Sequence, residues 1–77
     1  MISNSEKFKR LFNELSEIID LSDGNIKAAE ILVHLLHECA YEIVINNPHM
    51  ACCYGDDLMK ADNMLQNLYH KKSNPNG

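Results

Sequence analysis

The sequence has no tryptophan, only three glycines and two prolines, and few basic residues. A phosphate-binding loop needs several glycines close together, whereas these glycines are at positions 24, 55 and 77, so a loop of that kind is excluded. The three tyrosines and two phenylalanines are scattered and are not interleaved with Lys or Arg. This pattern argues against binding of single-stranded nucleic acid by stacking.

Long apolar runs and a disulfide framework are also missing. No stretch approaches the roughly 20 apolar residues that span a bilayer, and residues 1–20 lack the apolar core of a secretory signal. Three cysteines, two of them adjacent, fit free thiols in a reducing compartment, so we expect a cytoplasmic protein without a membrane segment. Free cysteine is commonly a small buried hydrophobe, as expected of Cys39 and Cys53, whereas Cys52 falls off its helix's apolar face and should be more exposed.

Charge is distributed unevenly along the chain, whose net charge is −4. Residues 11–59 contain nine carboxylates but only one lysine, Lys27, and no arginine. A protein that binds the nucleic-acid backbone usually presents a clustered basic surface, so direct binding of nucleic acid is not expected. An acidic middle favours a partner with a basic surface.

The apolar residues recur with helical periodicity in three segments. The first, 4–20, follows a capping-box spacing, Ser3 then Glu6, and has a one-sided apolar stripe. The middle segment, 25–47, contains no Gly or Pro and spreads its apolar residues over an arc of roughly 220° at 100° per residue. The third segment, 48–69, opens with proline at the first helical position and has an apolar arc of about 140°.

For two of the predicted helices, the sequence offers more than one candidate for the residue that begins the helix. Ser22 and Asp23 are both suitable caps for the middle helix. Gly55 inside a helix costs up to about 1 kcal/mol relative to alanine. An alternative start after Gly55, with Asp56 or Asp57 near the N-terminus, avoids that cost.

The width of the central apolar arc predicts the architecture. A surface helix normally carries an apolar stripe of a little over ~100°, so the middle helix needs at least two neighbours. We therefore predict an all-α fold, a small three-helix bundle or helical hairpin, as one domain over 1–72 with a disordered polar tail over 73–77. A chain of 77 residues buries only about 60–65% of its unfolded surface, which favours a homodimer through the middle helix over a monomer.

The polar stripe of the middle helix is the predicted partner-binding face. It carries imidazole, carboxylate and phenol groups within two to three turns, and the chain has little room for a substrate pocket. We therefore expect a non-enzymatic protein–protein interaction module, an adaptor, regulator or inhibitor, that needs no cofactor. The predicted contact residues are His34, His37, Glu38, Tyr41 and Glu42.

Two metal-ligand spacings support a second hypothesis, a small zinc-binding or metal-responsive protein. His34 lies three residues before His37 and four before Glu38, so each pair can converge on one point. His49 and Cys52 are also three residues apart, and imidazole and thiolate are common zinc ligands. Neither set supplies the four ligands of a structural zinc site.

The acidic middle of the chain supports a third hypothesis. Carboxylates that imitate a nucleic-acid backbone would let the protein block the basic surface of a nucleic-acid-binding partner. Binding driven in this way weakens steeply as salt concentration rises, which distinguishes it from the first hypothesis.

Overall fold

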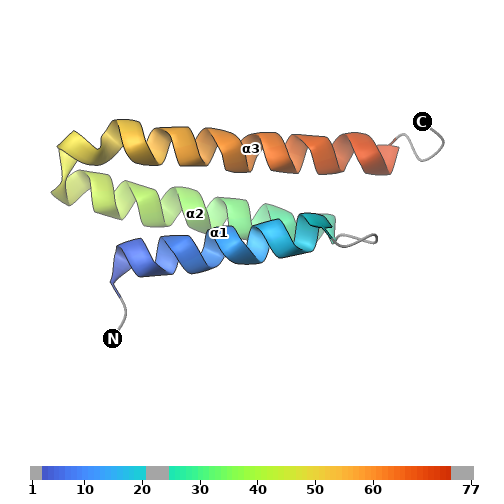
Figure 1. Cartoon of the computed structure of the whole chain (residues 1–77), viewed down its shortest axis with the longest axis horizontal. Coiled ribbons are helices and arrows are strands. Elements are labelled where there is room, and N and C mark those ends of the chain that lie inside the picture. Colours follow the sequence, from blue (N-terminus) through green and yellow to red (C-terminus); the bar gives the residue numbers. More distant parts are fainter. Residues whose placement is uncertain (1–2, 21–24, 74–77) are drawn as a thin grey trace.

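The computed structural model describes residues 3–20 and 25–73. These residues form three long helices and one turn of 3-10 helix, with no strand among them (Figure 1). The predicted all-α three-helix bundle is therefore confirmed. In chain order the elements are α1 (Asn4–Asp20), α2 (Ile26–Asn46), η1 (Pro48–Met50) and α3 (Ala51–Ser73).

Side-chain caps begin both α1 and α2. Ser3 Oγ accepts the backbone N–H of Glu6 at 3.3 Å, which is one half of the predicted capping box. Asn25 is the N-cap of α2, because its side chain accepts the backbone N–H three residues further on at 3.2 Å. Ser22 and Asp23, the predicted caps, lie outside the described residues.

Helix α3 continues through Gly55, so the alternative start after this glycine is wrong. The reason is the ring of Tyr54, which meets the ring of Phe8 edge to face at a centroid distance of 5.0 Å. Such a pair contributes about 0.5–1.5 kcal/mol beyond its buried area, which offsets the loss at the glycine. At its other end α3 extends to Ser73, four residues beyond the prediction, and the rest of the predicted tail lies outside the described residues.

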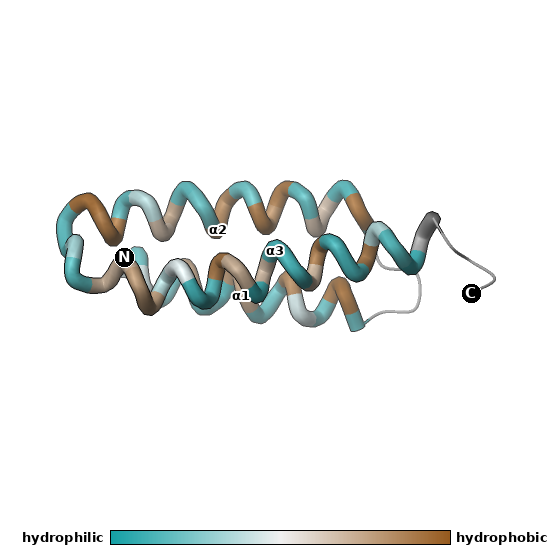
Figure 2. Tube along the Cα trace, turned by 90° about the horizontal axis from the view of Figure 1, so that it is seen from above, coloured by the Kyte–Doolittle hydropathy of each residue, from teal (hydrophilic) through white to brown (hydrophobic). Residues whose placement is uncertain are grey.

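Helix α2 lies at the centre of the fold and packs along both α1 and α3. Seen from above, α1 and α3 lie together on one side of α2 (Figure 2). The molecule is correspondingly flat, with extents of 45 × 25 × 15 Å. The buried core consists of Phe8, Leu15, Ala29, Leu32, Val33, Leu36, Cys39, Ala40, Ile43, Ala61 and Leu68.

The buried face of α2 is narrower than its apolar arc. Its buried residues, Ala29 to Ile43, span about 120° of the helix circumference at 100° per residue. Ile31 and Leu35 belong to the predicted arc, yet they are 60% and 37% exposed. The prediction that two neighbours would cover the whole arc is wrong at this edge, because α1 and α3 pack on the same side of α2 (Figure 2).

Candidate functional site

The structure places all five predicted partner-binding residues on the exposed side of α2. We call this side the outer face of α2, because it is turned away from the core formed with α1 and α3. Helical periodicity places these residues on the side of α2 opposite the buried ones. Apolar, acidic and imidazole side chains are interleaved on this face. The outer face consists of Lys27, Glu30, Ile31, His34, Leu35, His37, Glu38, Tyr41, Glu42 and Ile45, all of them exposed.

The two histidines of the outer face turn to different carboxylates. His34 Nε2 lies 2.9 Å from Glu38 Oε1, one turn further along the same helix. His37 Nε2 lies 3.0 Å from Oδ1 of Asp62, which belongs to α3. The predicted convergence of the two imidazoles on one point is therefore not found. Sequence reasoning missed Asp62, since only the packing of α3 on α2 brings it to His37.

The described residues hold no group of three or more His, Cys, Asp or Glu side chains that is arranged to bind a metal ion. The second predicted ligand pair is no exception. His49 lies in η1 and Cys52 in the first turn of α3, and both are exposed. Their spacing along the chain is ligand-like, but within residues 3–20 and 25–73 the fold brings no further ligands to them.

Tyr41 stands between two hollows of the surface. One is lined on α2 alone by His37, Glu38, Tyr41 and Glu42. The other, which we call the Tyr41 groove, runs between α2 and the start of α3 and is mostly apolar. Its lining residues are His37, Ala40, Tyr41, Val44, Ala51, Tyr54, Gly55 and Leu58.

Gly55 borders the Tyr41 groove. Apart from its chain neighbours and the backbone of its own helix, a Cβ atom built at this glycine would meet no atom within 4 Å, so the position has room for a side chain. Sequence reasoning treated Gly55 only as a weak point of the helix and missed its place in the groove. The contact between α2 and α3 that forms the groove follows from tertiary packing, which the periodicity of one helix does not reveal.

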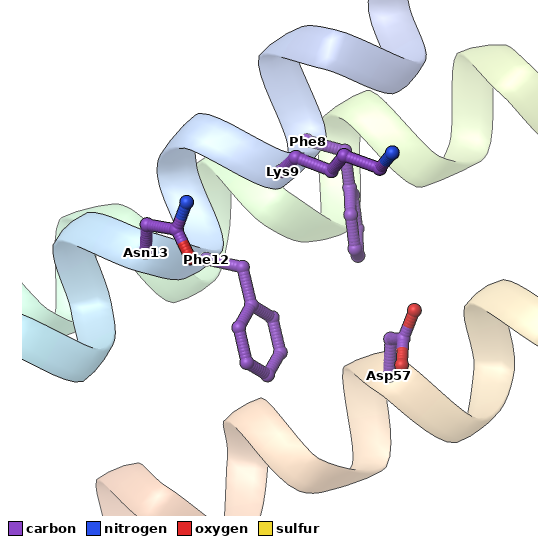
Figure 3. Close-up of a pocket in the computed structure, with 5 residues that line it drawn as sticks. All are labelled: Phe8, Lys9, Phe12, Asn13 and Asp57. Atoms are coloured by element: carbon purple, nitrogen blue, oxygen red, sulfur yellow. The ribbon is translucent and has the colours of Figure 1, made fainter.

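A third hollow lies between α1 and α3, on the side opposite the outer face of α2. Figure 3 shows Phe8 and Phe12 projecting from α1, with Asp57 on the neighbouring α3. Lys9 and Asn13 complete its lining. The lining combines two aromatic rings and an amide with one basic and one acidic side chain.

The three thiols occupy two different environments. Cys39 is buried, as predicted, and its Sγ donates a hydrogen bond to the carbonyl oxygen of Asn4 at 3.1 Å. Burial raises the pKa of this thiol above 9.0, the charge of Glu42 adds to the rise, and the nearby charge of Lys7 partly opposes it. Cys52 and Cys53 are both exposed, so the expectation of a buried Cys53 is wrong.

Comparisons of the chain with family models, with curated proteins and with solved structures found no match. Within the part of the chain that the structure describes, no helix has the length and apolar character to cross a membrane.

Proposed function

We propose that this protein is a non-enzymatic interaction module that docks a protein partner at the Tyr41 groove and the carboxylates beside it. The observation that carries the proposal is the position of Tyr41. Its side chain is 68% exposed and borders both an apolar groove and a hollow lined by Glu38 and Glu42. Tyrosine is over-represented among the residues that dominate binding energy at protein interfaces, because it combines a large apolar surface with a polar tip.

The two sides of Tyr41 define the chemistry of the partner. The groove accepts an apolar side chain, since Ala40, Val44 and Ala51 line it and Gly55 leaves space within it. On the other side, Glu38 and Glu42 are exposed carboxylates that attract lysine or arginine. The matching partner surface presents an apolar anchor flanked by basic residues.

The two walls of the groove are connected at two places. Its two walls, α2 and α3, are joined by one short 3-10 turn, η1. The hydrogen bond between His37 and Asp62 bridges the same two helices at 3.0 Å. A groove that exists before the partner binds loses little conformational entropy on binding. A small surface of this kind can therefore still bind its partner with measurable affinity.

Gly55 offers a test that leaves the fold intact. We expect Gly55→Met to fill the groove and weaken partner binding at least about tenfold, because the anchor side chain loses its site. The matched control is Gly55→Ala, whose single methyl enters open space. This variant should retain binding and should stabilise α3 by up to about 1 kcal/mol.

The partner itself is identified by placing a photoreactive amino acid at Tyr41 in cells of the source organism, with Glu17 on α1 as the control position. Affinities of the purified partner for both Gly55 variants are then measured by calorimetry. Equal affinity for Gly55→Met and the unmodified protein would contradict groove docking. A partner that crosslinks from Glu17 but not from Tyr41 would also contradict it.

Salt dependence separates groove docking from imitation of a nucleic-acid backbone. Docking of an apolar anchor predicts that affinity changes moderately with salt, because only the flanking charges are screened. Charge imitation predicts a steep fall in affinity and little effect of Gly55→Met. Affinity measured over a salt series with the same purified partner distinguishes the two.

A further inference from the structure

A second set of residues, all exposed except the half-buried Ala28, follows one edge of the outer face of α2 at alternating spacings of three and four residues. This is the spacing of a helix–helix seam, and the positions of this seam are Ala28, Ile31, Leu35, Glu38, Glu42 and Ile45. The first half of the seam is apolar, with Ile31 and Leu35 exposed beside a shallow hollow. The hollow is lined by Lys27, Glu30, Ile31, His34 and Leu35.

We infer that a second copy of this chain covers the first half of this seam, with the two α2 helices packed antiparallel about a two-fold axis. In that arrangement Ile31 of each copy faces Leu35 of the partner subunit, so all four side chains leave water together. A two-fold axis requires the same patch to fit itself. The first half of the seam meets this requirement because its two large apolar residues, Ile31 and Leu35, lie on either side of one midpoint.

The charges beside the seam are complementary about nearly the same midpoint. Lys27 lies four residues before Ile31, and Glu38 lies three residues after Leu35. The antiparallel arrangement therefore places Lys27 of each copy near Glu38 of the partner subunit. A parallel arrangement would place Lys27 against its own copy, and like charges in contact are unfavourable. The only lysine between positions 11 and 59 thus lies where the second copy presents a carboxylate.

The neighbouring carboxylate does not compete for this place. Glu30 Oε2 accepts a hydrogen bond from the hydroxyl of Tyr69 in α3 at 2.5 Å, so this side chain is drawn away from the seam. Glu38 is exposed, and its contact among the described residues is with His34 of its own helix, at 2.9 Å. A carboxylate oxygen can accept more than one hydrogen bond, so Glu38 can also receive Lys27 of the partner subunit.

Self-association in this register leaves the Tyr41 groove open. With the axis near residue 33, the two α2 helices overlap over residues 26–40, roughly 22 Å at 1.5 Å per residue. Tyr41 and Glu42 lie just beyond that overlap. The dimer would therefore present two Tyr41 grooves. Glu38 borders both surfaces, so the groove is tested at Gly55 and the seam at Lys27 and Ile31, which each belong to one surface only.

Charge exchange between Lys27 and Glu38 is the decisive experiment, with oligomeric state measured by sedimentation equilibrium over a wide range of protein concentration. We expect the unmodified protein to form a dimer and Lys27→Glu to weaken it at least about tenfold, because both attractive pairs become repulsive. The double variant Lys27→Glu/Glu38→Lys should restore dimerisation. Lys60→Glu on α3 is the matched control, since it makes the same charge change away from the seam and should leave the dimer unchanged.

Fold and interface effects can be separated. A carboxylate near the N-terminus of a helix is favourable, so Lys27→Glu should remain folded, as circular dichroism will show. Ile31→Ser should abolish the dimer and also remain folded, because Ile31 lies outside the core. An unmodified protein that is monomeric throughout, or a dimer that both variants leave intact, would overturn the inference. Gly55→Met should leave dimerisation unchanged, so failure of the dimer would not be mistaken for failure of groove docking.

Discussion

Ile43 and Ile45 lie two positions apart in α2, yet Ile43 is 7% exposed and Ile45 is 58% exposed. Both are the same residue type in the same helix, so neither hydropathy nor helix propensity distinguishes them. The difference is the direction in which each side chain points, because a step of two residues turns a helix by about 200°. Ile43 faces the core with α1 and α3, whereas Ile45 lies on the outer face.

The two faces of α2 differ in the size of the residues that accompany the large aliphatic ones. The buried face includes Ala29, Cys39 and Ala40, which leave room for side chains of neighbouring helices. On the outer face, aliphatic residues alternate with glutamate and histidine instead. Apolar content therefore does not by itself define the core of this protein, and exposed aliphatic residues are available for contacts with other chains.

The largest expected difference between the faces is in the free energy of unfolding. We expect Ile43→Ala to lower it by about 2–5 kcal/mol, through lost burial and the cavity that remains. Ile45→Ala should change it by no more than about 0.5 kcal/mol, because most of this residue is exposed and it lies outside the core. Urea unfolding of both variants, followed by circular dichroism, measures the two values. Similar losses for both would show that a partner or second copy covers Ile45 in solution.

Thiol reactivity probes the same comparison without altering the core. Cys52 and Cys53 should react at once with a thiol reagent such as DTNB, whereas Cys39 should react only as the fold opens. Burial keeps the reagent away from Cys39. The raised pKa of Cys39 also lowers the fraction of its thiol that is present as thiolate, the form that attacks the reagent.

The variant Cys52→Ser/Cys53→Ser isolates Cys39 and makes its rate directly measurable. Added denaturant should bring that rate up to the rate of an exposed thiol. Immediate reaction of the isolated Cys39 in the native protein would show that α1 does not hold α2 as the structure describes.

Local patterns predicted the helices well because helix ends depend on nearby residues. The span of α1 agrees with the prediction, and α2 ends one residue inside each predicted boundary. Pro48 was predicted as the first helical residue of the third segment, and it opens η1, which leads into α3. The exposure of Ile31 and Leu35 was not predicted, because it depends on the side of α2 that α1 and α3 share.

The candidate site likewise combines features that the local sequence predicts with features that only the packing of helices determines. The five predicted residues of α2 do lie on one exposed face, since their spacing alone determines that. Asp62 and Gly55 were missed because each meets α2 only through the packing of α3. Contacts between helices depend on the axial shift and rotation of one helix against the other, and neither quantity is set by the periodicity of a single segment.

The smallest expected effect lies at the boundary between the outer face and α3, where the hydroxyl of Tyr69 donates a hydrogen bond to the carboxylate of Glu30. This hydrogen bond to the carboxylate raises the pKa of Tyr69 above 10.0, and desolvation and the charge of Glu30 add to the rise. A raised pKa means that the folded state binds the phenol proton more tightly than the unfolded state does. The resulting stabilisation is therefore fully present below pH 10.0 and is lost as the pH rises through the folded pKa.

The ultraviolet absorbance of the unmodified protein and of Tyr69→Phe is measured as the pH rises. The difference between the two curves reports the ionisation of Tyr69 alone. We expect the midpoint of the difference curve to lie above 10.0 and to fall towards that value in the background of Glu30→Ala, because the hydrogen bond is the largest cause of the rise. The exposed position of the pair keeps the effect on stability at neutral pH small. A midpoint at or below 10.0 would mean that Glu30 is not held by α3 in solution, in which case its carboxylate would be free to turn towards Lys27 and the seam.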